Sequence, residues 1–207
     1  MRDALSADKA MLIQKRGTKL YVNILPGEYY ATNQPVTIRT LLGSCVAACL
    51  YDPVSRVIGM NHFLLSNRRY ARNIPAVLSE AGRYGIQAMD LLINDMLKLG
   101  AKRENLRAKA FGGGSIYPGS KTKDNFLCVG DVNTRFVREF LKNDGIPLVA
   151  EDLGGYNARV IHFVFDDFAV HVKKIDKTTA SSLVQEERQL WLKAIEQQGK
   201  SKVQTEL

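Results

Sequence analysis

Short stretches in the first third of the chain alternate apolar and polar residues or are rich in β-branched residues, a pattern typical of β-strands. These stretches cover residues 19–25, 36–42, 45–51 and 56–65. The pairs Gly43-Ser44 and Asp52-Pro53, which favour turns, separate the last three of them. This part of the chain is therefore predicted to form neighbouring strands, or a strand that runs into a short helix.

The pattern changes to a helical period from residue 86. Apolar residues recur there at i, i+3, i+4 and i+7, and Gly100 supplies a C-terminal stop; these residues are Met89, Leu92, Ile93 and Met96. A second amphipathic helix is predicted from Asp131, a good N-cap residue, to Gly145. Residues 106–111, between the two helices, are predicted to form a strand that runs into a glycine-rich stretch.

The last third of the chain contains two alternating runs, residues 157–165 and 168–174, which predict a β-hairpin. Strands grouped around two separated helices favour an α+β domain over a regular βαβ array. We assign this domain to residues 19–175. Residues 1–18 are expected to be a loosely ordered extension, and residues 176–207 a polar tail with an amphipathic helix.

The composition is that of a globular chain: of 207 residues, 45% are hydrophobic and 24% are charged. No apolar run approaches the ~20 residues of a membrane helix, and the N-terminus lacks the continuous apolar core of a secretory signal. These features predict a cytoplasmic protein that does not insert into membranes. The net charge of +8 favours an acidic partner, but no aromatic-basic motif accompanies it to indicate nucleic-acid binding.

The cysteines are three in number and lack the close CxxC spacing of a zinc site, so reduced thiols and no metal are expected. Cys45 follows Gly43-Ser44, a tight pair that can expose the next side chain and direct backbone N–H groups toward a bound carbonyl, as an oxyanion hole requires. His62, seventeen residues later, is the nearest histidine and can act as the base that a thiol nucleophile needs. Cys49 and Cys128 lie in apolar surroundings and are expected to be packing residues.

The segment LGSCVAACLYDP, followed by GMNHFLL, resembles the signature of the chemoreceptor glutamine deamidases, the CheD family of bacterial and archaeal chemotaxis. The agreement continues in AKAFGGGSI, VGDVN and AEDLGGYNAR, and it covers residues 19–175. This resemblance implies a cysteine hydrolase with a mixed β-sandwich core flanked by helices, resembling the deamidase domain of cytotoxic necrotizing toxins. The implied fold agrees with the α+β expectation.

The resemblance also implies catalytic residues: Cys45 matches the family nucleophile, and His62 matches its histidine. The family's third catalytic residue is a threonine six residues before the cysteine, where this chain has Arg39. Two hydroxyls lie nearby, and strand parity favours Thr37 over Thr40 because Thr37 shares a face with position 39. Arg39 itself is a further candidate for the supporting role.

Three consecutive glycines at residues 112–114 lack the Lys-Ser/Thr pair of a phosphate loop. The resemblance instead implies that this stretch lies near the catalytic cleft, with Gly113, Gly114 and Ser115 as a backbone wall for the substrate amide. In the motif that follows, Cys128 replaces the family's first asparagine, while Gly130 and Asn133 are retained.

The leading hypothesis is a protein-glutamine deamidase that converts glutamine side chains of methyl-accepting chemotaxis receptors to glutamate through a Cys-His thioester mechanism, without a cofactor. The resemblance also implies a CheC-type phosphatase as a candidate partner. The alternative is a weakly active or inactive chemotaxis adaptor of the same fold, because Arg39 replaces the family's threonine.

Overall fold

The structure, a computed structural model, describes residues 12–65, 77, 80–115, 129–175, 185, 189 and 192. These residues form two five-stranded sheets and two α-helices. The α+β class expected from the sequence is confirmed.

The first sheet is built from the N-terminal strands and the C-terminal hairpin. Its order is β1 (Leu12–Arg16), β2 (Lys19–Asn23), β4 (Val36–Leu42), β9 (Ala158–Val164) and β10 (Val170–Ile175). Strands β2 and β4 are parallel and the other neighbours are antiparallel, so the sheet is mixed.

The second sheet is also mixed. Its order is β3 (Tyr29–Thr32), β6 (Val57–Asn61), β5 (Val46–Asp52), β7 (Arg107–Gly112) and β8 (Leu148–Leu153). Strands β7 and β8 are parallel, and the remaining neighbours are antiparallel. The Asp52-Pro53 turn joins β5 to β6, as the sequence predicts.

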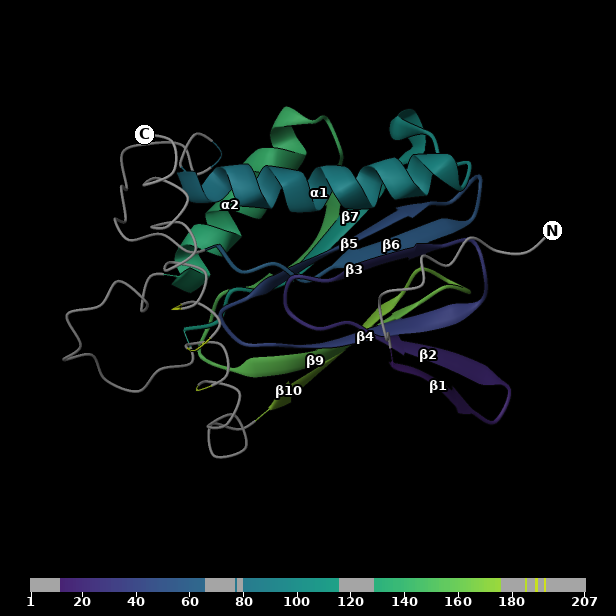
Figure 1. The fold of residues 1–207 in the computed structure, drawn as a ribbon, viewed down its shortest axis with the longest axis horizontal. Coiled ribbons are helices and arrows are strands. Elements are labelled where there is room, and N and C mark those ends of the chain that lie inside the picture. The colour runs from purple at the N-terminus through teal and green to yellow at the C-terminus, as the bar shows by residue number, and fades with distance from the viewer. Residues whose placement is uncertain are drawn as a thin grey trace, which may run out of the picture.

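The helices α1 (Glu80–Lys98) and α2 (Val129–Asn143) cover the second sheet on the side away from the first sheet (Figure 1). A short 3-10 helix, η2 (Arg103–Asn105), precedes β7. Helix α1 lies very close to β6, since a Cβ atom at Gly59 would lie 2.6 Å from Leu92 and 2.9 Å from Met96.

Two hydrophobic cores result from this layering. One lies between the helices and the second sheet and includes Val46, Leu50 and Phe136. The other lies between the two sheets and includes Ile38, Cys45 and Phe163. Alternate residues of β5 face alternate cores, because successive side chains of a strand point to opposite faces. Cys45 therefore faces the first sheet, and Val46 faces the helices.

Several boundaries differ from the expectation. Residues 12–16, expected to be loosely ordered, form β1, which pairs with β2 along its whole length. The sequence analysis also missed β3 and β8, whose side chains are mostly half-buried or exposed and therefore give a weak hydrophobic pattern. Helix α1 begins six residues earlier than the periodicity suggested. The predicted C-terminal helix lies almost entirely outside the described residues.

Among the described residues, no helix combines the length and the apolar character needed to cross a membrane.

Candidate active site

The loop that carries Cys45 passes from the first sheet to the second, because it joins β4 to β5. Backbone hydrogen bonds hold it against the glycine stretch that follows β7. The N–H of Gly113 donates to the carbonyl of Cys45, and the N–H of Gly114 donates to the carbonyl of Gly43, both at 2.7 Å. The Cys45 side chain is fully buried.

Glycine is required where these two segments meet. Gly112 has a φ of +110°, and a Cβ atom there would lie 2.2 Å from the Cys45 carbonyl oxygen. Gly113 has a φ of +66°, and a Cβ atom there would lie 2.2 Å from the Thr134 hydroxyl. Side chains at these positions would push the Cys45 loop away from α2 and β7.

The same hydrogen bonds change the interpretation of the glycine stretch. Gly113 and Gly114 donate their N–H groups to the Cys45 loop, and the N–H of Ser115 donates to the carbonyl of Gly155 at 2.7 Å. None of these three groups can then donate to a substrate amide without breaking a backbone bond. In the structure the N–H groups of Gly113 and Gly114 support the cysteine loop, and the role of this stretch as a wall for the substrate amide stays a prediction.

Strand register places Cys45 and His62 on the same face of neighbouring strands. The antiparallel pairing of β5 with β6 continues past β6 to a bridge between Val46 and Phe63. In this register His62 lies opposite Ala47, two residues from Cys45, and both side chains face the core between the sheets. The Cα atoms of such diagonal neighbours on adjacent strands lie about 7–8 Å apart, and the side chains can be closer.

The imidazole of His62 contacts the first sheet through Thr40. The Thr40 Oγ1 lies 2.8 Å from Nδ1 of His62 and also donates a hydrogen bond, at 2.8 Å, to the carbonyl of Ile24. A threonine hydroxyl has one proton to donate. Because that proton is used on Ile24, Thr40 accepts from His62, and the histidine carries its proton on Nδ1.

The other ring nitrogen is unprotonated in this tautomer. The Nε2 of His62 is buried and has no hydrogen-bond partner among the described residues. Burial lowers the pKa of His62 from 6.5 to about 3, so the ring is neutral near pH 7. The site therefore holds a neutral imidazole with a free lone pair on Nε2, the form that can accept a proton.

The structure brings Thr40, and not Thr37, to the histidine. Thr40 lies between the inward-facing residues Ile38 and Leu42 of β4, whereas Thr37 and Arg39 share the opposite face of the strand. Arg39 is paired there with His162 of β9. The parity argument correctly grouped Thr37 with position 39, but that face points away from His62.

A buried arginine, which the sequence analysis did not single out, holds the loop between β8 and β9. The guanidinium of Arg159 donates to the carbonyls of Asp152, Gly154 and Asn157 and pairs with the Asp152 carboxylate at 2.9 Å. Its side chain is 2% exposed, and burial lowers its pKa, opposed by the charge of Asp152. In the sequence, the only signal was a charged residue at an inward-facing position of an alternating strand.

This loop reaches the cysteine through the glycine stretch. The N–H of Gly154 donates to the carbonyl of Gly112 at 2.8 Å, next to the bond between Gly113 and Cys45. Arg159 thus supports the cysteine loop indirectly. It holds the segment around Gly154, and Gly154 bonds to the glycine stretch that holds Cys45.

The remaining candidate residues lie elsewhere. Cys49 is buried in the core between the sheets, as expected, and burial raises its pKa well above that of an exposed thiol. Cys128 lies outside the described residues. His162 and His171 are paired on the outer face of the first sheet. The described residues contain no group of three or more metal-ligating side chains, so they offer no candidate metal centre.

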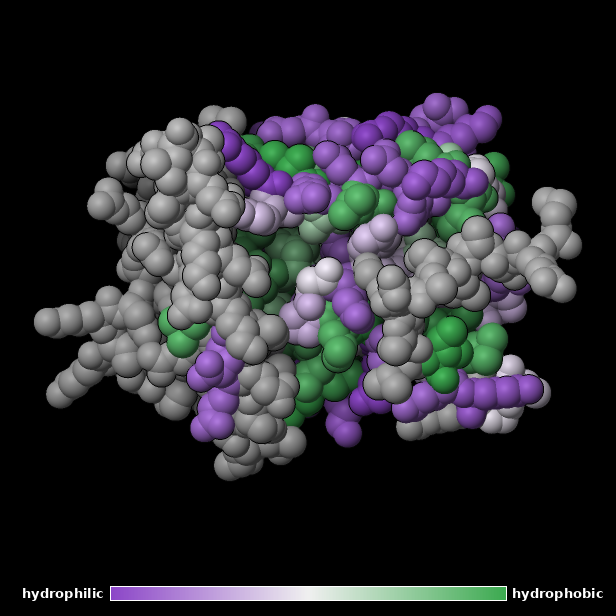
Figure 2. Space-filling model, viewed as in Figure 1, coloured by the Kyte–Doolittle hydropathy of each residue, from purple (hydrophilic) through white to green (hydrophobic). Residues whose placement is uncertain are grey.

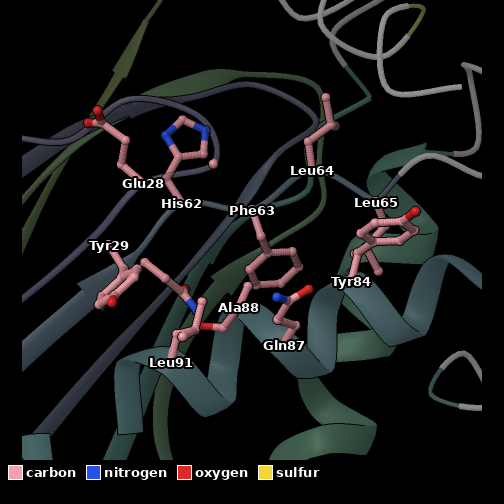
Figure 3. Close-up of a pocket in the computed structure, with 12 residues that line it drawn as sticks. Glu28, Tyr29, His62, Phe63, Leu64, Leu65, Tyr84, Gln87, Ala88 and Leu91 are labelled. Carbon is pink, nitrogen blue, oxygen red and sulfur yellow. The ribbon is translucent and has the colours of Figure 1, made fainter. Parts of the chain in front are cut away.

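A pocket of about 270 Å³ adjoins His62 on the side of α1. In Figure 3 the imidazole points away from α1, whereas Phe63 points toward it. Hydrophobic side chains are visible in the recess below α1 (Figure 2), and Tyr84 and Leu91 are 50% and 43% exposed. The pocket is lined by Gly27, Glu28, Tyr29, Asn61, His62, Phe63, Leu64, Leu65, Tyr84, Gln87, Ala88 and Leu91.

The structure thus defines a two-sheet α+β domain with a buried cysteine, histidine and threonine between its sheets. A family model described as CheD chemotactic sensory transduction matches residues 65–174. The chain is also 56% identical to a probable chemoreceptor glutamine deamidase CheD 1 of Geobacter sulfurreducens, over 82% of this chain and 85% of that protein. The chain belongs to the CheD family.

Further relatives show the same similarity. A probable chemoreceptor glutamine deamidase CheD 2 of Shewanella oneidensis is 48% identical over 75% of this chain and 77% of that protein. Among solved structures, the Bacillus licheniformis hypothetical protein YfiH aligns with a TM-score of 0.35 and 19% identity, over 59% of this chain and 49% of that chain. That overlap is too small to support a conclusion about the fold, and the resemblance to toxin deamidase domains stays a prediction.

The low pKa of His62 predicts a specific pH dependence of stability. Between about pH 6.5 and about pH 3 the unfolded chain binds a proton on this histidine that the folded chain does not bind. The free energy of unfolding should therefore fall as the pH drops through this range, by up to about 1.4 kcal/mol per pH unit from this group. Urea unfolding at several pH values measures the slope. In His62→Gln the slope should be smaller by up to about 1.4 kcal/mol per pH unit, the contribution of one proton. A slope equal to that of the wild type would contradict the low pKa assigned to His62.

Proposed function

We propose that this chain hydrolyses the side-chain amide of glutamine residues in methyl-accepting chemotaxis receptors, giving glutamate and ammonia. The names of its curated relatives support the substrate, since they are called probable chemoreceptor glutamine deamidases. One observation supports the chemistry most directly: a neutral His62, fixed by Thr40 with Nε2 unprotonated, lies on the same face as Cys45.

In the proposed reaction the sulfur of Cys45 attacks the carboxamide carbon, and Nε2 of His62 accepts the thiol proton. The same nitrogen then gives this proton to the departing nitrogen, which leaves as ammonia, and a thioester remains on Cys45. A water molecule attacks the thioester and transfers a proton to Nε2. The thioester opens to release glutamate, and the proton returns to Cys45. The net reaction consumes one water and releases one ammonia, and it needs no cofactor.

Stabilisation of the tetrahedral intermediate is assigned to the Gly43-Ser44 turn, as the sequence predicts. The carbonyl of Gly43 accepts from Gly114, and the carbonyl of Ser44 accepts from Asn133. In a trans peptide the C=O and N–H groups point in opposite directions. The N–H groups of Ser44 and Cys45 are therefore directed away from the glycine stretch and α2, and their role as oxyanion donors stays a prediction from the sequence.

The alternative of an inactive adaptor rested on the replacement of the family's threonine by Arg39. Since Thr40 makes the contact with His62, that replacement gives no reason to expect loss of activity. A CheC-type phosphatase as partner stays a prediction of the family resemblance, as does the cytoplasmic location.

The nucleophile assignment is tested by co-expressing the chain with a chemoreceptor and measuring the conversion of receptor glutamine to glutamate by peptide mass spectrometry. Cys45→Ala should abolish conversion, because it removes the sulfur on which the proposed thioester forms. Cys49→Ala serves as the matched control and should retain most of the activity, since Cys49 is a buried packing residue. Conversion by Cys45→Ala at the wild-type rate would end the cysteine mechanism.

The two threonines of β4 provide a second test. Thr40→Val removes the acceptor that fixes the His62 tautomer, and kcat should fall about 10- to 100-fold, a part of the ~10²–10⁴-fold that general acid–base catalysis contributes. Thr37→Val makes the same chemical change on the opposite face of the strand and should leave kcat close to that of the wild type. Steady-state deamidation rates of the two purified variants measure the difference. The reverse order would show that Thr40 does not support the base.

A further inference from the structure

Asn133, on the second turn of α2, is fully buried and uses both ends of its side-chain amide. Its Nδ2 donates to the carbonyl of Ser44 at 2.8 Å. Its Oδ1 accepts from the N–H of Leu65 at 2.9 Å. One side chain therefore bonds to two backbone segments that are far apart in the sequence.

These two segments carry the proposed catalytic pair. Ser44 immediately precedes Cys45, and Leu65 lies three residues after His62 on the segment that pairs with β5 through Val46 and Phe63. The amide of Asn133 thus bridges the cysteine segment and the histidine segment at a point beyond the end of the regular β5–β6 ladder. Past this bridge, the described strand pairing no longer fixes the separation of the two segments.

Helix α2 is itself fixed against the cysteine loop. A Cβ atom at Gly130 would lie 2.5 Å from the carbonyl oxygen of Gly113, whose N–H donates to the carbonyl of Cys45. The backbone of α2 is therefore in close contact with the glycine stretch one turn before Asn133. This contact leaves the helix, and with it the amide of Asn133, little freedom to shift relative to the loop.

We propose that Asn133 is a positioning residue that sets the separation of Cys45 and His62. The proposal rests on the function proposed above, since it assigns these residues as nucleophile and base. Without the amide, the Ser44 carbonyl and the Leu65 N–H lose their buried partner, and each segment must shift to find another. A displacement of about 1 Å between reacting groups can cost about 10²-fold in rate.

Two substitutions test the proposal. Asn133→Asp keeps the size and the acceptor for Leu65, but it places an oxygen against the Ser44 carbonyl. Asn133→Ala removes both bonds. In each variant kcat for receptor deamidation should fall about 10²-fold, while KM stays near the wild-type value because Asn133 does not contact the receptor.

Two controls on the same helix separate positioning from stability. Thr134→Ser changes the neighbouring residue but keeps the hydroxyl that lies against Gly113, and should leave kcat unchanged. Val137→Ala removes core methyl groups and lowers the free energy of unfolding without touching the cysteine loop bonds. At a temperature where all variants remain folded, Val137→Ala should keep the wild-type kcat.

A second measurement needs no receptor. The rate of alkylation of Cys45 by iodoacetamide, followed by mass mapping over a range of pH, reports how well His62 assists the thiol. This rate should fall in both Asn133 variants and stay unchanged in Val137→Ala. Cys49 is as buried as Cys45, and burial raises its pKa, so it is the internal control for folding: opening of the whole domain would raise its alkylation rate as well.

The possible failures are distinguishable. If the wild-type chain does not convert receptor glutamine, the proposed function is wrong, and if Cys45→Ala converts it at the wild-type rate, the cysteine mechanism is wrong. In both cases the alkylation rates still report on the positioning of Cys45 by Asn133. If Cys45→Ala is inactive but the Asn133 variants match Val137→Ala in kcat and in alkylation rate, the positioning proposal is wrong. If Cys49 reacts as fast as Cys45 in both Asn133 variants, the amide holds the fold as a whole and the specific positioning proposal is likewise overturned.

Discussion

The hydrogen bond between Thr40 and His62 joins the two sheets at the point where the proposed chemistry takes place. Thr40 belongs to the first sheet, and His62 directly follows a strand of the second. A buried imidazole needs a partner for its N–H group, and Thr40 is the partner that the opposite sheet supplies. Because the Thr40 proton is already used on Ile24, this single contact fixes both the packing of the ring and its tautomer.

The position of the cysteine depends on a different set of contacts, made almost entirely by backbone. The loop from β4 to β5 accepts hydrogen bonds from the N–H groups of Gly113 and Gly114, and Arg159 holds the adjoining loop in place. The proposed nucleophile is therefore supported by the second sheet and by α2, whereas the proposed base is oriented by the first sheet. Catalysis as proposed requires both sheets to keep their relative position, so the stability of the sandwich and the activity are closely connected.

The sequence predicted the elements that have a clear hydrophobic periodicity, and it predicted the candidate residues whose side chains can act as nucleophile or base. The turn at Gly43-Ser44 and the antiparallel strands around Asp52-Pro53 agree with the observed register, which places Cys45 and His62 on one face of neighbouring strands. The preference for Thr37 failed because parity shows which residues share a face but not which face is inside. The apolar neighbours Ile38 and Leu42, two residues to either side of Thr40, carried that information. The contacts of Asn133 join residues 68 and 89 positions apart, and no local pattern reveals them. Arg159 bonds to residues at most seven positions away, but its only sequence signal was a charge at an inward-facing position of a strand.

The central claim is that His62 is held neutral, with its proton on Nδ1, in the folded protein. Nitrogen-15 NMR of the histidine side chains measures the tautomer and its titration directly. The account predicts a protonated Nδ1 and an unprotonated Nε2 for His62 from about pH 8 down to about pH 4, because burial depresses the pKa of this ring. A proton on Nε2 at neutral pH, or a titration midpoint near that of an exposed histidine, would contradict it.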